Sequence, residues 1–174
     1  MSTPRERILD TATRLFHNQG YNNTGINQII LEASVAKASF YQHFKSKDEL
    51  CIEYLNKRHD YWFTAFSNFV AKANNTKNRI LAAFDFIIEM NKKEDFRGCA
   101  FINILPEINI DQGGILEIVQ SHKKDLKKFF ERELNSKLLS THIYLLFESA
   151  LLESKLFKSN QLVTKSKAII NDII

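Results

Sequence analysis

The segment spanning residues 34–50 holds side chains that can contact phosphates and base edges. Lys37 and Tyr41 are four residues apart, so on a helix they share one face. Residues able to donate hydrogen bonds to phosphates recur along the segment, namely Lys37, Tyr41, His43 and Lys47. Small and amide side chains that would let a helix approach base edges lie between them, namely Ala38, Ser39 and Gln42. These residue types in this spacing are typical of a helix that recognises DNA.

The residues before this segment predict the elements that position it. Phe40 and Phe44 also lie four apart, on the side opposite the polar residues, and are expected to be buried. Thr24-Gly25 precedes an apolar helical pattern formed by Ile26, Ile29, Ile30 and Ala33. We expect Thr24 to cap that helix and to direct its N-terminal amides, with Gly25, at a phosphate. The link Ala33-Ser34-Val35 has the length of the turn in a helix-turn-helix.

Two further helix starts frame the motif. Thr3-Pro4-Arg5-Glu6 is a capping box with proline at the first helical position, and Gly20 fits a left-handed residue after that helix. Ser46-Lys47-Asp48-Glu49 is a second capping box, and it opens a long helix. Lys47 lies in the first turn, where a cation is unfavourable for the helix dipole. A phosphate partner would offset that cost, so we predict that Lys47 contacts DNA.

At these positions the chain resembles the TetR family of bacterial transcriptional regulators. The matching residues are Arg7-Ile8-Leu9-Asp10-Thr11-Ala12, Leu15-Phe16, Gly20-Tyr21, Thr24, Phe40-Tyr41-Gln42-His43-Phe44 and Ser46-Lys47-Asp48-Glu49-Leu50. The resemblance implies an all-α fold with an N-terminal helix-turn-helix head of three helices and a C-terminal helical domain for ligand binding and dimerisation. We place the DNA-binding domain at residues 1–46, its motif at about 25–44, and the second domain at 47–174. Ala36 and Ala38 stand where the family usually has a capping residue and a glycine, so base contacts there become apolar.

Composition sets broad limits on the class of protein. The 174 residues include 24 Lys and Arg against 20 Asp and Glu, and this mild excess is equally typical of a solvated surface. Only 5 Gly and 2 Pro favour long helices over a turn-rich β architecture. Cys51 and Cys99 form neither a disulfide framework nor a metal cluster, and no metal site or cofactor is expected. The sequence has no apolar signal segment or membrane span, so we expect a cytoplasmic protein with reduced thiols.

Helical periodicity continues through the rest of the chain. The long helix from Lys47 is expected to reach 74–75, a second helix runs from Thr76 to about residue 91, and a short one at 98–109 is kinked or ended by Pro106. Gly113-Gly114 is expected to break the chain, and the lysines at 123, 124, 127 and 128 to form a solvated face. The last helices, at about 141–158 and 160–174, are apolar on several faces. In the family, the corresponding helices pair as a four-helix bundle, so we expect a homodimer formed through them.

The family resemblance also implies an apolar effector cavity in the second domain. Aromatic rings such as Trp62 and Phe66 are candidates to line it, although each ring is more readily explained as core. Polar residues among apolar ones are better candidates, namely Asn103, Glu107, His122, Tyr144 and Glu148. His122 could equally be a core histidine.

Cys99 follows Gly98 in a segment resembling a branch of the family whose members sense electrophiles or oxidants through a cysteine. Such a thiol must be partly exposed and its thiolate stabilised, and Lys155 is a candidate cationic neighbour. The alternative is a small buried apolar residue.

No sequence motif for catalysis, a phosphate loop or metal binding is present, so we do not expect an enzyme. The sequence predicts a regulator, most simply a repressor, that leaves a palindromic operator when a small molecule or electrophile binds. Two alternatives stay open at this point. One is a DNA-binding regulator without an effector, and the other is a helical-bundle enzyme or small-molecule-binding protein.

Overall fold

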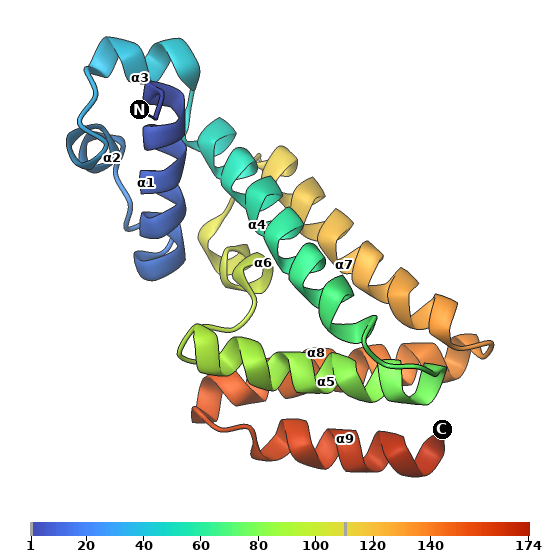
Figure 1. The fold of residues 1–174 in the computed structure, drawn as a ribbon. Coiled ribbons are helices and arrows are strands. Elements are labelled where there is room, and N and C mark those ends of the chain that lie inside the picture. The colour runs from blue at the N-terminus through green and yellow to red at the C-terminus, as the bar shows by residue number, and fades with distance from the viewer. Residues whose placement is uncertain (1, 110) are drawn as a thin grey trace. The chain divides into compact units, whose positions relative to one another are not determined.

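The computed structural model describes residues 2–109 and 111–174, and its regular elements are all helical, as predicted (Figure 1). The elements are α1 (Pro4–Gln19), α2 (Ile26–Glu32), α3 (Lys37–His43), α4 (Lys47–Val70), α5 (Thr76–Lys93), α6 (Ala100–Asn103), the 3₁₀ turn η1 (Leu105–Glu107), α7 (Gly113–Glu133), α8 (Lys137–Phe157) and α9 (Gln161–Ile173). They form two compact units. The first unit comprises Met1–His59 and Ala100–Gln120, and the second comprises Asp60–Cys99 and Ser121–Ile174. No helix in the described ranges is both long and apolar enough to cross a membrane.

The first unit is built on α1, which begins as the sequence predicts. The Thr3 hydroxyl accepts a hydrogen bond from the Glu6 amide at 3.3 Å, and the Thr3 amide donates to the Glu6 carboxylate at 2.7 Å. The helix then buries Ile8, Ala12, Leu15 and Phe16. Gly20 has a positive φ of 91°, but its ψ of 170° is extended rather than left-handed helical. At the start of α4 the Ser46 hydroxyl caps the Glu49 amide, while Glu49 binds the Lys45 amide instead of closing a capping box.

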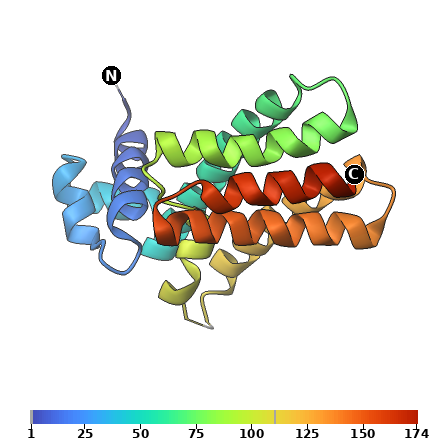
Figure 2. The same ribbon diagram turned by 90° about the horizontal axis from the view of Figure 1, so that it is seen from below.

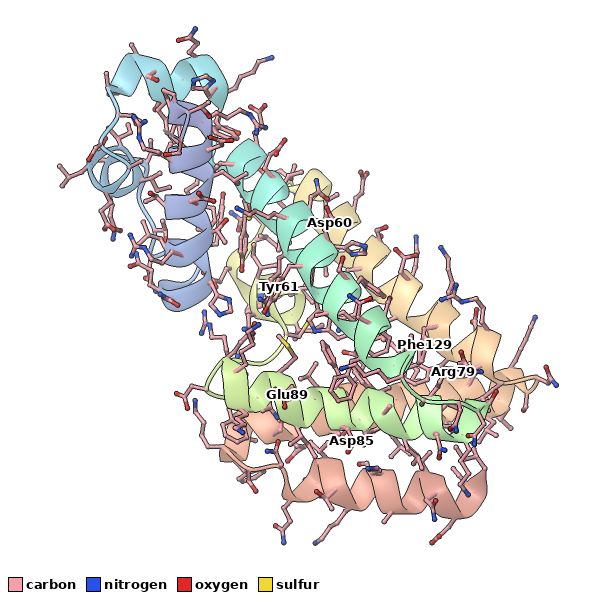
Figure 3. All side chains as sticks on the ribbon, in the orientation of Figure 1. Asp60, Tyr61, Arg79, Asp85, Glu89 and Phe129 are labelled. Atoms are coloured by element: carbon pink, nitrogen blue, oxygen red, sulfur yellow. The ribbon has the colours of Figure 1, made fainter. Side chains whose placement is uncertain are left out.

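In the second unit, α5, α8 and α9 lie side by side (Figure 2). Their shared core includes Ile80, Phe84, Ile143, Phe147, Val163 and Ile170. At the edge of this core lies Asp85 of α5, labelled in Figure 3. The Lys167 ammonium of α9 donates to both of its carboxylate oxygens, each at 2.7 Å. Arg79 binds Glu133 of α7 at 2.8 Å. The shared core thus joins α5, α8 and α9, and the two partly exposed ion pairs add links between helices of this unit.

Several predicted boundaries were wrong. The α4 helix ends at Val70 rather than at 74–75. Pro106 lies in η1, and the helical segment before it is only the four residues of α6, because proline cannot continue an α-helix. Gly113 and Gly114 are the first residues of α7 instead of a break. The entropic cost of glycine, about 0.5–1 kcal/mol relative to alanine, applies to the middle of a helix rather than to its first turn.

Candidate DNA-binding surface and effector site

The α3 helix presents the predicted recognition face over a rigid base. Phe40 and Phe44 are 0% and 1% exposed, and their ring centroids lie 6.2 Å apart. The polar residues on the other side reach the surface, and Tyr41 is 45% exposed while its ring contacts Phe40 edge-on at 5.3 Å. Lys37, Ala38 and Gln42 are exposed, and Ser39 and His43 are half-buried. The face can therefore meet a groove while the two rings fix its orientation.

Thr24 does not have the role we expected. Its side chain is fully buried, and its hydroxyl donates a 2.6 Å hydrogen bond to the Gly20 carbonyl. The N-cap of α2 is the exposed Gly25, which makes no side-chain capping bond. The predicted Thr24 cap is therefore wrong, since Thr24 stabilises the turn after α1 and offers no group to a phosphate. Because Gly25 has no side chain, it does not cover the N-terminal amides of α2.

Lys47 has partners inside the protein. Its ammonium lies 4.1 Å from the centroid of the Tyr21 ring, a cation–π contact. The Tyr21 hydroxyl donates to Asp48, and the Gln112 amide donates to both, at 2.9 Å to Tyr21 and 3.0 Å to Asp48. Burial lowers the pKa of Lys47, and burial together with Asp48 raises the pKa of Tyr21. The ring and Asp48 offset the unfavourable helix-dipole position, so a phosphate is not required to explain this lysine.

Glu107 contacts the link between α1 and α2. Its carboxylate accepts a 2.8 Å hydrogen bond from the Asn22 amide. A Cβ at Gly20 would lie only 2.9 Å from the two Glu107 carboxylate oxygens. Asn103 and Glu107, predicted as effector residues, thus belong to the first unit, and Glu107 has a bracing role there. Sequence reasoning missed Gln112 and Asn22, because their partners are 64 to 91 residues away in the chain.

The aromatic effector candidates lie together in the second unit. Trp62 stacks on Phe66 at 4.8 Å and meets His122 edge-on at 5.4 Å, and Phe86 packs against Trp62 at 5.3 Å. Phe66 and His122 are 1% and 2% exposed, whereas Trp62 is half-buried. Trp62 is thus a partly exposed ring of this cluster, beside the buried Phe66 and His122.

A polar cluster in the same unit contains the other candidates. Lys123 binds both oxygens of Glu148 at 2.7 Å, with side chains 12% and 20% exposed. Burial opposes the charge on Lys123, but Cys99 and Glu148 outweigh it and raise the pKa of this lysine. Burial and then Glu148 raise the pKa of Tyr144. The prediction that Lys123 lies on a solvated face is therefore wrong. The sequence signal that could have indicated its burial is its position beside the apolar face of α7, three residues before Leu126.

Cys99 and Lys155 lie beside Gly98. Gly98 has φ +75°, and a Cβ there would come within 2.8 Å of the Lys155 side chain, which packs directly over this glycine. Burial first, and then Arg97, lower the pKa of Lys155, while Cys99 opposes the change. Cys99 is partly exposed, whereas Cys51 of the first unit is buried and burial raises its pKa. Of the two thiols, Cys99 is the accessible one. Among the described residues no group of His, Cys, Asp or Glu is placed to hold a metal.

A helical head with an exposed α3 face over buried rings defines a helix-turn-helix DNA-binding protein. Residues 8–54 match the family described as bacterial regulatory proteins, tetR family. Residues 8–54 therefore form a TetR-family DNA-binding domain, and the chain is similar along its length to transcriptional regulators of that family, which are not enzymes.

Relatives similar along the whole chain support this assignment. The HTH-type transcriptional regulator LmrA of Bacillus subtilis is 27% identical over 180 residues, covering 98% of this chain and 96% of LmrA. IcaR of Staphylococcus aureus, a negative transcriptional regulator of the biofilm operon icaADBC, is 25% identical over 184 residues, covering 97% of this chain and 93% of IcaR. A regulator structure from Streptomyces avermitilis superposes with a TM-score of 0.80 at 27% identity, covering 99% of this chain and 98% of that one.

Proposed function

We propose that the protein is a repressor that binds a palindromic operator as a homodimer in the bacterial cytoplasm and leaves it when an effector binds. The carrying observation is the exposed face of α3, where Lys37, Tyr41 and Gln42 stand over the buried rings of Phe40 and Phe44. Two such helices would occupy successive major grooves ~34–36 Å apart. The negative regulator IcaR, similar over nearly the whole chain, supports repression.

The partner subunit would pack on α8 and α9. Eight large apolar side chains of these helices are 39–69% exposed in the single chain, namely Leu138, Leu145, Leu152, Leu156, Phe157, Leu162, Ile169 and Ile173. On α8 the leucines at 138, 145 and 152 recur every seven residues, the repeat of a helix–helix interface. So large an apolar surface favours association. A second copy would bury it as a four-helix bundle.

The effector site would use the second unit. Trp62, Phe66 and His122 supply an aromatic wall, and Cys99, Tyr144, Glu148 and Lys155 supply polar and nucleophilic groups. An effector that binds better to the conformation unable to span both half-sites would release the operator. For an electrophilic effector, the Cys99 thiolate would be the attacking group.

One observation favours an effector-free regulator as the second candidate. Phe66, Phe86 and His122 each contact the Trp62 ring at centroid distances of 4.8–5.4 Å, and the rings so form a packed cluster. Thermal melting in the presence of small apolar compounds separates the two candidates. A rise in melting temperature that Phe66→Ala abolishes supports the effector, and melting that no compound shifts supports the effector-free regulator.

The test of operator binding is fluorescence anisotropy with DNA from upstream of the protein's own gene and a scrambled duplex, over a salt series. Tight binding of two protomers to the upstream duplex alone supports the proposal, while weak binding to both that vanishes with salt means phosphate attraction only. Tyr41→Ala and Lys47→Ala should weaken binding to both duplexes, whereas Lys37→Ala should also alter sequence preference.

The electrophile arm uses N-ethylmaleimide as the probe. Release of bound DNA by this reagent should be lost in Cys99→Ser and kept in Cys51→Ser, because the Cys51 thiol is buried. Equal release from all three proteins would contradict sensing by Cys99.

A further inference from the structure

The turn between α2 and α3 ends α2 with a Schellman motif. The Val35 amide donates to the Ile30 carbonyl at 3.2 Å, and the Ser34 amide donates to the Leu31 carbonyl at 3.1 Å. The residue between Ala33 and Val35 must then be left-handed, and Ser34 has φ +51°. Glycine is the usual residue there, because a Cβ makes this conformation costly. This chain therefore needs another contact to hold the turn.

Arg7 of α1 supplies that contact. Its guanidinium donates from Nε to the Ala33 carbonyl at 3.1 Å and from Nη2 to the Ser34 carbonyl at 3.4 Å, and Nη1 binds the Ser2 carbonyl at 3.1 Å. A planar fork can satisfy two neighbouring carbonyls at once, which a lysine ammonium does less well. The positive charge also faces the C-terminal end of α2, where the helix dipole favours a cation.

The entry to α3 depends on this turn. The N-cap of α3 is Ala36, and no side chain caps the helix. The direction in which Lys37 and Tyr41 leave the head is thus set by the backbone of residues 33–36 and by the packing of Phe40.

We propose that Arg7 is a positioning residue for DNA recognition. It holds the left-handed Ser34 turn, and with it the recognition helix, by binding the carbonyls of Ala33 and Ser34. The inference rests on the proposed function in one respect, namely that α3 reads the operator. Because Arg7 acts through backbone geometry, its loss should reduce discrimination between sequences rather than the attraction to phosphates.

The first arm of the test measures amide hydrogen exchange in the full-length protein without DNA. In Arg7→Lys, exchange at the Val35 amide should rise about tenfold, as expected for loss of one charge-assisted hydrogen bond. Adding Ser34→Gly should restore protection, since glycine adopts the turn unaided. Arg14→Lys is the matched control, because Arg14 also joins α1 to α2, through Glu32, but does not touch the turn. Unchanged exchange at Val35 in Arg7→Lys would refute the clamp.

The second arm measures binding to a duplex selected from a random library by the wild-type protein, and to its scrambled counterpart. Arg7→Lys should reduce the ratio of the two affinities about tenfold with the salt slope unchanged, and Ser34→Gly should restore the ratio. Equal losses on both duplexes, with a salt slope lower by about one, would make Arg7 a phosphate ligand and overturn the inference. Failure of the wild-type protein to select any duplex would count against the proposed operator, while the exchange arm still decides the role of Arg7.

Discussion

Gly20→Ala tests the contact between Glu107 and the end of α1. The backbone of Gly20, at φ +91° and ψ 170°, lies in a region that costs a residue with a side chain about 1–3 kcal/mol. The new Cβ would also meet both Glu107 oxygens at 2.9 Å. Displacing the carboxylate would break its bond to the Asn22 amide, about 1.5–3 kcal/mol for a hydrogen bond to a charged group. We therefore expect a total loss of about 2.5–6 kcal/mol in the free energy of unfolding.

The assay is urea unfolding followed by circular dichroism at fixed protein concentration, because the stability of the proposed dimer would depend on concentration. Glu107→Ala is the partner variant, since it removes the clash and the hydrogen bond together. In that background, Gly20→Ala should cost only the backbone strain, about 1–3 kcal/mol. An equal cost of Gly20→Ala with and without Glu107 would refute the close approach of the carboxylate.

Three further changes have defined outcomes. Because the pKa of Tyr21 is raised above its ordinary value of 10.0, the folded protein keeps this proton to higher pH than the unfolded chain does. The contribution of Tyr21 to the free energy of unfolding is therefore full below pH 10 and falls as the pH rises further. Urea unfolding at pH 8 to 11 should show this decline, and the decline should be smaller in Tyr21→Phe. Thr24→Val should lower the free energy of unfolding by about 1–2 kcal/mol, because it removes a buried hydrogen bond. DNA affinity, measured by anisotropy under conditions in which the variant is fully folded, should not change. A selective loss of DNA binding would contradict the buried role of Thr24. Glu148→Gln should cost roughly 3 kcal/mol by leaving Lys123 buried without its counter-charge, and Lys123→Met with Glu148→Gln should recover much of that in thermal melting.

The head was predictable because its signals are local. The Thr3–Glu6 capping box, the stripe of α1 and the Phe40–Phe44 pair all act within four residues, so their spacing determines their structure. The environments of Thr24 and Lys47 were not predicted. Thr24 bonds the Gly20 carbonyl only four residues away, but the sequence did not distinguish this buried position from an exposed N-cap. Lys47 lies over the Tyr21 ring, which is 26 residues away in the chain, so local spacing could not indicate this contact.

The second unit shows the same limit. The sequence predicted a solvated face for the lysines of α7, but it could not show that Lys123 would meet Glu148 of α8. Cys99 and Lys155 are separated by more than fifty positions in the sequence, so only the fold brings Cys99 close enough to affect the pKa of Lys155. The DNA-binding and effector assignments of individual side chains remain predictions for the experiments above.

The first compact unit is assembled from two separate stretches of chain, Met1–His59 and Ala100–Gln120. The contacts of Glu107 with Asn22 and of Gln112 with Tyr21 and Asp48 join these stretches. A chimaera that grafts residues 1–46 onto the body of another regulator would therefore inherit α1 to α3 but lose the supports of Tyr21 and Asn22. To transplant the sequence preference of this protein, the donor segment should carry 100–120 as well as 1–59. The part of this chain to transfer for its DNA sequence preference is thus made of two separate stretches of sequence.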